Sequence, residues 1–266
     1  LDEGDPYTKL KLDKSISKIK SRGIFSDVKH VMKDGSAANL KIIDIIVEEQ
    51  PTGEISAGAG VGTNGGTIAF TVKENNWLGE GKRVAFDVEL NEESLRGTIN
   101  YTNPNYDFLG NSLNYSLGSV SSDKPNQGYE NTVFTGGIGT TFEQYKDIYA
   151  RLGLNLTFDD LKTDNTASDS MKSQSGKFTE LAANYGFSYD KRNRVFQPTD
   201  GNITGFDQSF PLYADKAFIS NTITSSTYRT LSENVIGAGK FYVSSVNGLN
   251  DEDVRISKRK TMSNKR

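Results

Sequence analysis

Apolar and polar residues alternate with a period of two in one segment after another of this chain, from residue 54 onward. The clearest segment is Ile148–Phe158, in which every second residue is Ile, Ala, Leu or Phe. A period of two is that of a β-strand with one apolar face. About ten residues are enough for a tilted strand to cross a membrane. The pattern therefore predicts membrane-spanning strands rather than helices.

The connections between these segments also follow a pattern. We expect short connections at 103–105, 143–146 and 231–233, and longer polar ones at 120–128, 159–175 and after residue 248. Short turns at one end and long loops at the other are typical of outer-membrane barrels, whereas a soluble β-sandwich, the alternative, needs no such rhythm. The pattern favours a barrel, with strands expected at 54–62, 67–74, 82–91, 95–102, 110–119, 130–142, 147–158, 178–190, 202–211, 216–229 and 235–246.

The first 50 residues have a different character. Leu12, Ile16 and Ile19 share one face of a predicted short helix, and Gly23 is placed to end it. Two strands are predicted after it, at 27–33 and 40–48. This α-β-β unit is too small to be a stable domain alone. We therefore divide the chain into residues 1–50 and 51–266.

Composition excludes several function classes. The net charge of −3 gives no electrostatic support for nucleic-acid binding. The chain has no cysteine, which excludes disulfides and thiolate metal sites. Its single histidine, His30, excludes mechanisms that need two imidazoles, and no nucleophile–base pair is evident. There is no run of about 18 apolar residues that would form a membrane helix. We expect no enzymatic activity, no cofactor and no metal.

One stretch resembles a nucleotide-binding motif. Residues 60–65, Gly-Val-Gly-Thr-Asn-Gly, fit the pattern G-x-G-x-x-G. A phosphate-binding loop needs a helix directly after these glycines. The residues that follow, Thr67–Val72, alternate and are rich in β-branched residues, as in a strand. We therefore interpret residues 63–66 as a hairpin turn.

Four stretches resemble, in the right order, the BamA family of outer-membrane protein assembly factors of Gram-negative bacteria. Val47–Glu54 resembles the junction between the last POTRA domain and the barrel, and Gly23–Val28 resembles the helix-to-strand step of that POTRA domain. Glu74–Gly81 resembles the first periplasmic turn, and Asp190–Gly201 the D-x-R…P-T-x-G signature. The resemblance spans nearly the whole chain. It implies a mostly β fold, in which an incomplete α+β POTRA domain precedes a partial antiparallel transmembrane β-barrel of about 11 of roughly 16 strands.

The resemblance also implies a function. Members of the family fold β-barrel proteins and insert them into the outer membrane by templating client strands at a lateral gate. The implied partners are unfolded outer-membrane proteins, assembly lipoproteins such as BamD, and outer-membrane lipid. Residues 1–50 would lie in the periplasm. Residues 51–266 would end in the sixth extracellular loop, so that the chain is a piece of a longer protein. The alternative is a two-partner translocator of the same superfamily, which secretes a polypeptide.

The implied gate is the first barrel strand. Alternating glycines would weaken this strand and offer its backbone to a client strand. A second interpretation, compatible with the first, is that the glycines only permit curvature. The residues concerned are Glu54, Ile55, Ser56, Ala57, Gly58, Ala59, Gly60, Val61 and Gly62.

Two turns carry the other family residues. In the signature, we expect Asp190 and Arg192 to form a structural ion pair that supports the turn Pro198, Thr199 and Gly201, not a ligand site. In the periplasmic turn formed by Asn76, Trp77, Leu78 and Gly79, we expect Trp77 to be an interfacial aromatic, together with Phe108.

Two charged stretches have less specific interpretations. Asp159, Asp160 and Asp164 are expected in a solvated loop, since their spacing does not suit calcium. The basic residues at 258–260 and 265–266 are expected to be solvated extracellular charge, with lipopolysaccharide binding as the alternative.

Overall fold

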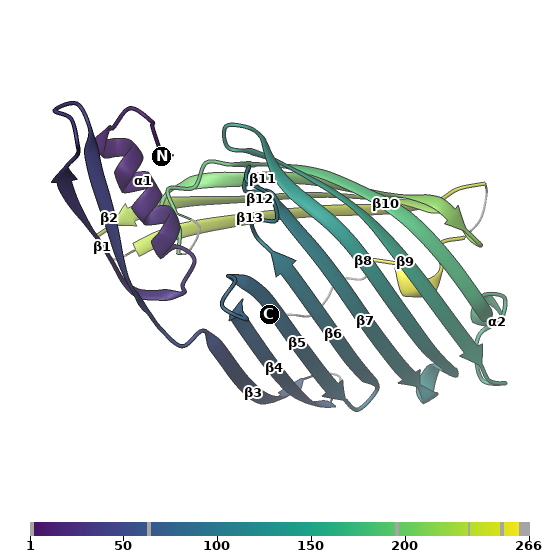
Figure 1. Cartoon of the computed structure of the whole chain (residues 1–266). Coiled ribbons are helices and arrows are strands. Elements are labelled where there is room, and N and C mark those ends of the chain that lie inside the picture. The colour runs from purple at the N-terminus through teal and green to yellow at the C-terminus, as the bar shows by residue number, and fades with distance from the viewer. Residues whose placement is uncertain (1–2, 63–64, 195–196, 234, 251–252, 261–266) are drawn as a thin grey trace.

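The computed structural model describes residues 3–62, 65–194, 197–233, 235–250 and 253–260. It consists of a small α-β-β unit followed by a curved antiparallel sheet of 11 strands (Figure 1). Thr63 and Asn64 of the predicted hairpin turn, Val195 and Phe196 of the signature, and the basic residues Lys265 and Arg266 lie outside the described residues.

The α-β-β unit comprises α1 (Lys9–Lys20), β1 (Phe25–Asp34) and β2 (Lys41–Glu49). Thr8 caps the helix, since its side chain accepts a hydrogen bond from the backbone N–H of Lys11 (3.2 Å). Gly23 follows the helix with a φ of +67°, a conformation that suits glycine. Leu12 and Ile16 are buried against Val28. The predicted helix and two strands are thus confirmed, while their assignment to a POTRA domain stays a prediction.

The large sheet contains all eleven predicted strands. Each strand pairs antiparallel with the next one in the sequence, and β3 and β13 form the edges of the sheet within the described chain. The predicted hairpin between β3 and β4 is confirmed by the pairing of Gly62 with Gly65, but Gly65 and Gly66 of the predicted turn already belong to β4. The strands are β3 (Gly53–Gly62), β4 (Gly65–Trp77), β5 (Lys82–Asn91), β6 (Ser94–Asn103), β7 (Ser112–Lys124), β8 (Tyr129–Tyr145), β9 (Ile148–Thr163), β10 (Gly176–Asp190), β11 (Gly201–Ala214), β12 (Phe218–Ser232) and β13 (Val235–Gly248).

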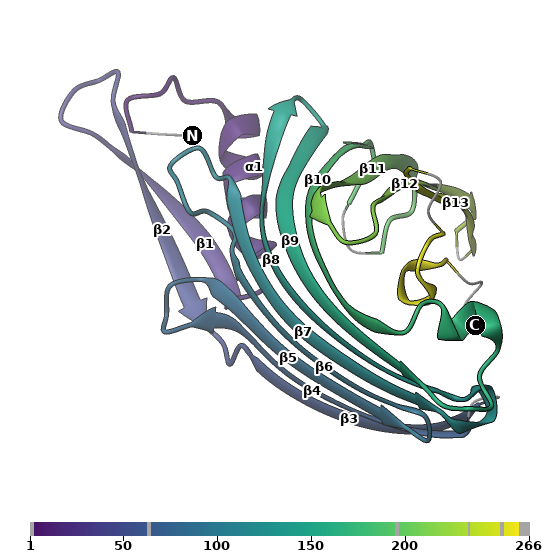
Figure 2. The ribbon, with the colours of Figure 1, turned by 90° about the vertical axis from the view of Figure 1, so that its right-hand side faces the viewer.

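The sheet is curved, with one concave and one convex face (Figure 2). The segment 253–260 lies inside the curve, where Lys258 contacts Thr157 of β9. The concave face therefore carries Thr157 and the residues that alternate with it, such as Arg151 and Asn155. The convex face carries Leu152, Leu154, Leu156 and Phe158, which are exposed. An apolar outer face and a polar inner face are expected of a membrane barrel.

Short helices complete the described chain. They are α2 (Asp169–Lys172), η1 (Pro125–Gln127) and η2 (Ile256–Lys258). Within the described ranges, no helix has the length and apolar character needed to cross a membrane.

The two ends of the sheet are named here by their position. The near end is the end at which β3 begins, beside β2, and it carries the connections 78–81, 104–111, 146–147 and 191–200. The far end carries the connections 92–93, 125–128, 164–175 and 215–217.

The predicted lengths of two connections were wrong. The connection at 103–105 is longer, 104–111, because Asp107 holds a wider turn together by accepting hydrogen bonds from the backbone N–H (3.0 Å) and side chain (2.7 Å) of Asn111. The loop at 120–128 is shorter, because polar residues continue β7 until Lys124 pairs with Tyr129.

Candidate functional site

The first strand of the large sheet, β3, contains all nine predicted gate residues. Its concave positions are Glu54, Ser56, Gly58 and Gly60, as their pairing with Lys73, Thr71, Ala69 and Thr67 of β4 indicates. The intervening residues face the convex side, where Val61 is 92% exposed. In the described part of the sheet, β3 pairs with β4 alone. The N–H and C=O groups on its other edge are therefore open to another strand.

Gly58 and Gly60 are not required by packing. A Cβ at either position would stand more than 4 Å from the nearest atom of the described chain outside its own sequence neighbours, and neither residue has a positive φ. By contrast, a Cβ on Gly186 of β10 would collide with Asp207 and with the backbone of Phe206. Glycine in a strand interior lowers stability by about 0.5–1 kcal/mol relative to alanine. Gly58 and Gly60 thus weaken β3 without relieving a clash within the described chain.

The signature residues lie together in the connection between β10 and β11. The side chain of Arg192 donates to Asp190 from Nε to Oδ1 (2.9 Å) and from Nη2 to Oδ2 (2.6 Å), and the backbone N–H of Arg192 donates to Oδ1 (3.1 Å). Gly201 has a φ of +96°, and a Cβ there would collide with the Lys191 carbonyl. The Thr199 carbonyl accepts a hydrogen bond from Thr230 of β12 (3.0 Å). Pro198 directly precedes Thr199 in the same turn.

Sequence reasoning missed Asn193 in this turn. Its Nδ2 donates to Thr199 Oγ1 (2.7 Å), and its Oδ1 accepts from the backbone N–H groups of Thr199 (3.2 Å) and Asp200 (3.3 Å). Asn193 therefore joins the two halves of the connection. Asparagine is a common turn residue for this reason, which is the signal that could have identified it.

A neighbouring near-end turn is tied to the signature. Lys191 Nζ lies 2.6 Å from Asp147 Oδ2, and the Asp190 N–H donates to the Asp147 carbonyl (2.9 Å). The hydrogen bond from Lys191 lowers the pKa of the Asp147 carboxyl below its ordinary value. The described residues of the connection thus form a turn that hydrogen bonds and an ion pair hold in place.

The first near-end turn of the sheet exposes apolar side chains. Asn76 closes the turn by accepting hydrogen bonds from Gly79 N–H through its carbonyl and from Gly81 N–H through its side chain (2.8 and 2.7 Å). Leu78 and Gly79 have positive φ angles of 56° and 76°. Trp77 and Leu78 are exposed. Phe108, in the next near-end connection, is 97% exposed, and the interfacial role predicted for these aromatics stays a prediction.

A buried ionic cluster at the far end corrects two predictions. Asp159 and Lys258 were both expected to be solvated. However, β9 continues past residue 158, which places Asp159 on the concave face, and the segment 253–260 covers it (Figure 2). Arg255 Nη2 lies 3.2 Å from Asp159 Oδ1, and these side chains are only 6% and 3% exposed. Lys258 Nζ lies 2.6 Å from Glu180 Oε2 of β10.

Aromatic and hydroxyl groups complete this cluster. The Arg255 guanidinium lies 3.4 Å from the centre of the Phe178 ring, and Ser257 Oγ donates to Asp159. Burial lowers the pKa of Arg255, and the carboxylate of Asp159 opposes this shift. The only sequence signal for these contacts was the alternation in β9: Asp159 is two residues after Thr157, so it lies on the same face of the strand.

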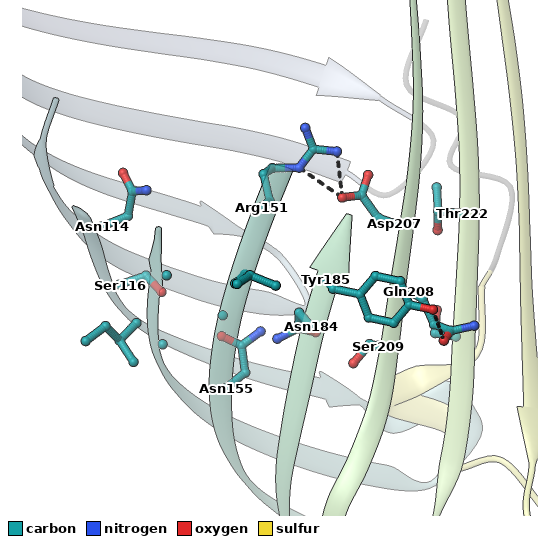
Figure 3. Close-up of a pocket in the computed structure, with 16 residues that line it drawn as sticks. Asn114, Ser116, Arg151, Asn155, Asn184, Tyr185, Asp207, Gln208, Ser209 and Thr222 are labelled. Atoms are coloured by element: carbon teal, nitrogen blue, oxygen red, sulfur yellow. Dashed lines mark hydrogen bonds and ion pairs between the residues drawn. The ribbon is translucent and has the colours of Figure 1, made fainter. Parts of the chain in front are cut away.

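The concave face also contains a polar cavity of about 390 Å³ (Figure 3). Arg151 donates to Asp207 Oδ1 through Nε (3.0 Å) and Nη2 (2.8 Å), and to Ser188 Oγ through Nη1 (3.0 Å). Amide side chains such as Asn114 and Asn155 line the remainder. Among the residues that the structure describes, no group of three or more acidic or histidine side chains could hold a metal ion.

Comparison with known proteins identifies the superfamily of the large sheet. The model of the Omp85 superfamily domain matches residues 76–263. The outer membrane protein assembly factor BamA of Neorickettsia risticii is 27% identical over 220 residues, which cover 79% of this chain and 29% of that protein.

Two solved structures share the fold. The crystal structure of BamA from Haemophilus ducreyi lacking POTRA domains 1–3 has a TM-score of 0.73 at 19% identity, over 96% of this chain and 52% of that one. CdiB from Acinetobacter baumannii has a TM-score of 0.58 at 10% identity, over 94% of this chain and 48% of that one. The present chain thus spans less than a third of its curated relative and about half of each solved structure.

Proposed function

Because the chain belongs to the Omp85 superfamily, we propose that it folds β-barrel proteins and inserts them into the bacterial outer membrane, as part of the central subunit of the assembly machine. The observation that carries this proposal is the open first edge of the large sheet. β3 is short, contains two glycines that packing does not require, and offers one free row of backbone hydrogen-bonding groups.

The proposed mechanism is strand templating at this edge. An incoming client strand pairs with β3 through main-chain hydrogen bonds, which need no particular client sequence. Because Gly58 and Gly60 present no side chains to the concave face, the new pair has few side-chain contacts on that face and can separate again. The reaction needs neither a cofactor nor covalent chemistry, and we propose that the protein is not an enzyme.

The proposed partners follow from the same mechanism. They are unfolded outer-membrane proteins, assembly lipoproteins such as BamD, and the lipid of the outer membrane. The apolar convex face would contact lipid, and the α-β-β unit would lie in the periplasm as the end of a POTRA domain. Trp77 and Phe108 would then lie at the periplasmic membrane interface.

The alternative is a translocator of the same superfamily that secretes a polypeptide through the barrel interior. It is the weaker candidate, because the chain superposes less well on CdiB (TM-score 0.58) than on BamA (0.73), and the relative from Neorickettsia risticii is an assembly factor. The two functions also place the passenger polypeptide differently. An insertase contacts its client at the β3 edge, whereas a translocator contacts it along the concave face.

Disulfide capture in the full-length protein distinguishes these functions. The chain has no cysteine, so single cysteines can be placed at Ala57 in β3, at Asn155 on the concave face, and at Phe134 on the convex face of β8 as a mid-sheet control. We expect a stalled client that carries one cysteine to be captured by Ala57→Cys and not by Phe134→Cys. Capture by Asn155→Cys instead would favour the translocator. Capture at none of these positions would contradict both.

A further inference from the structure

A basic cavity lies at the near end of the sheet, between α1 and the first near-end connections. Its volume is about 640 Å³. Figures 1 and 2 both show α1 at this end of the large sheet. The α-β-β unit contributes Lys18 and Arg22 to the lining, and the sheet contributes Arg83 and Glu143.

Positive charge dominates this cavity. Arg22 Nη1 reaches the β4–β5 turn, where it lies 3.4 Å from the point at which a Cβ on Gly81 would stand. Lys18 Nζ lies 3.7 Å from the corresponding point on Gly110. The ion pairs found in the described chain do not include Lys18, Arg22 or Arg83. The one carboxylate of the lining, Glu143, accepts a hydrogen bond from the Asp147 N–H (2.9 Å).

The other lining residues are suited to a peptide. Amide and hydroxyl side chains can exchange hydrogen bonds with peptide groups, and apolar side chains between them can cover a short apolar residue. The amide and hydroxyl group comprises Ser21, Asn75, Asn105, Asn111, Ser112 and Thr141, and the apolar group comprises Ile24, Leu109 and Tyr149.

The position of the cavity argues against a lipid ligand. Arg83 pairs with Thr102, and Thr102 with Asn114, which belongs to the polar concave face. Tyr149 alternates with Arg151 of the same face. The cavity therefore opens toward the polar concave face of the sheet. The apolar convex face, which would contact lipid, is on the opposite side.

We propose that this cavity binds acidic segments of unfolded polypeptides at the mouth of the barrel. The proposal rests on the proposed function, and it specifies which part of a client is held there. The cavity holds three cations, Lys18, Arg22 and Arg83, and one carboxylate, Glu143, which already accepts a hydrogen bond. This excess of positive charge favours Asp and Glu side chains over neutral ones, and it also accelerates the association of an acidic segment with the cavity.

The test is a binding measurement with two matched peptides and the full-length protein in detergent. One unstructured fluorescent peptide carries four glutamates, and the other carries four glutamines at the same positions. At low ionic strength we expect the glutamate peptide to bind about tenfold more tightly, which corresponds to about 1.4 kcal/mol. The preference should decrease as salt is added, because salt screens exposed charges.

Charge variants assign the preference to the cavity. The double variant Arg22→Glu/Arg83→Glu should lose the preference for the glutamate peptide. The control Lys20→Glu/Arg96→Glu changes the net charge by the same amount at residues that do not line the cavity, and it should keep the preference. Arg22→Gln/Arg83→Gln, which adds no repulsion, should show an intermediate loss if the reversal variant fails to fold.

Three results would overturn the inference: equal binding of both peptides to the unmodified protein, an equal loss in the control variant, or displacement of the peptide by phosphatidylglycerol dissolved in the same detergent, which would identify a lipid phosphate site. Insertion of a client into liposomes is measured in parallel. If insertion proceeds while both peptides bind equally, only the cavity proposal fails. If the preference is present and insertion is absent, the proposed function fails instead.

Discussion

Individual glycines in the large sheet serve different purposes, and the space around each one distinguishes them. Gly186 faces Asp207 and the Phe206 carbonyl, so its lack of a side chain is a packing requirement. Gly58 and Gly60 face open space on an edge strand. Their lack of side chains therefore has to be explained by weak strand pairing or by curvature, and substitution separates these purposes.

Gly58→Ala/Gly60→Ala is the first prediction. We expect the variant to fold and to be more stable by about 0.5–1 kcal/mol per site, because alanine restricts the unfolded chain and fits the strand. Client insertion should become slower, because the edge opens less readily. Urea unfolding and insertion into liposomes measure the two effects. Gly186→Ala is the control and should destabilise by about 1–3 kcal/mol through overpacking. A less stable double variant would instead support the curvature interpretation.

The second prediction concerns the buried pair of Asp159 and Arg255. Asp159→Asn leaves a guanidinium buried without its charge partner, which costs about 3–5 kcal/mol in comparable sites. We expect the segment 253–260 to leave the concave face, and trypsin to cleave after Lys258 and Arg259 at least tenfold faster in the full-length protein. The charge-swapped variant Asp159→Arg/Arg255→Asp should slow cleavage again. Unchanged cleavage in Asp159→Asn would mean that the ion pair does not hold the segment.

Among the elements, the strands were predictable and the contacts between distant segments were not. Alternation identifies a strand such as β9 because side chains on successive residues point to opposite faces. It does not indicate where a polar strand ends, and so β7 and β9 were predicted too short. Arg255 and Asp159 are 96 positions apart by their numbering (255 − 159), and no local pattern joins them. The turn residues Gly201 and Asp190 were identified only through the family resemblance.

The near-end connections should respond to pH, which is the third prediction. Lys191 lowers the pKa of Asp147 in the folded protein. A depressed carboxyl pKa contributes stability above the unfolded value, near 3.8, and this contribution is lost as pH falls through the folded value. We therefore expect the thermal midpoint to decrease between pH 5 and pH 3 (approximate limits for an aspartate). Asp147→Asn should remove this part of the decrease. An identical pH profile in the variant would exclude the pair as a contributor.

At the scale of the whole molecule, the sheet has a strong centre and a weak first edge. β8, β9 and β10 contain 17, 16 and 15 residues and each has a partner on both sides, whereas β3 contains 10 residues and one partner in the described sheet. A gate needs this gradient, because the opening strand has to separate while the remainder of the sheet stays folded. Local opening free energies in proteins range from near zero to the global value.

Amide hydrogen exchange measures this gradient directly in the full-length protein, and it is the fourth prediction. We expect slowest exchange in β8–β10 and fastest exchange in β3, with rates that differ by a factor of at least 100, since each 1.4 kcal/mol of opening free energy is about tenfold. Gly58→Ala/Gly60→Ala should slow exchange in β3 and leave β9 unchanged, because the substitution acts on the first edge alone. If β3 is as protected as β9 in the unmodified protein, its edge is held closed by some other contact, and this edge cannot be the site at which client strands enter.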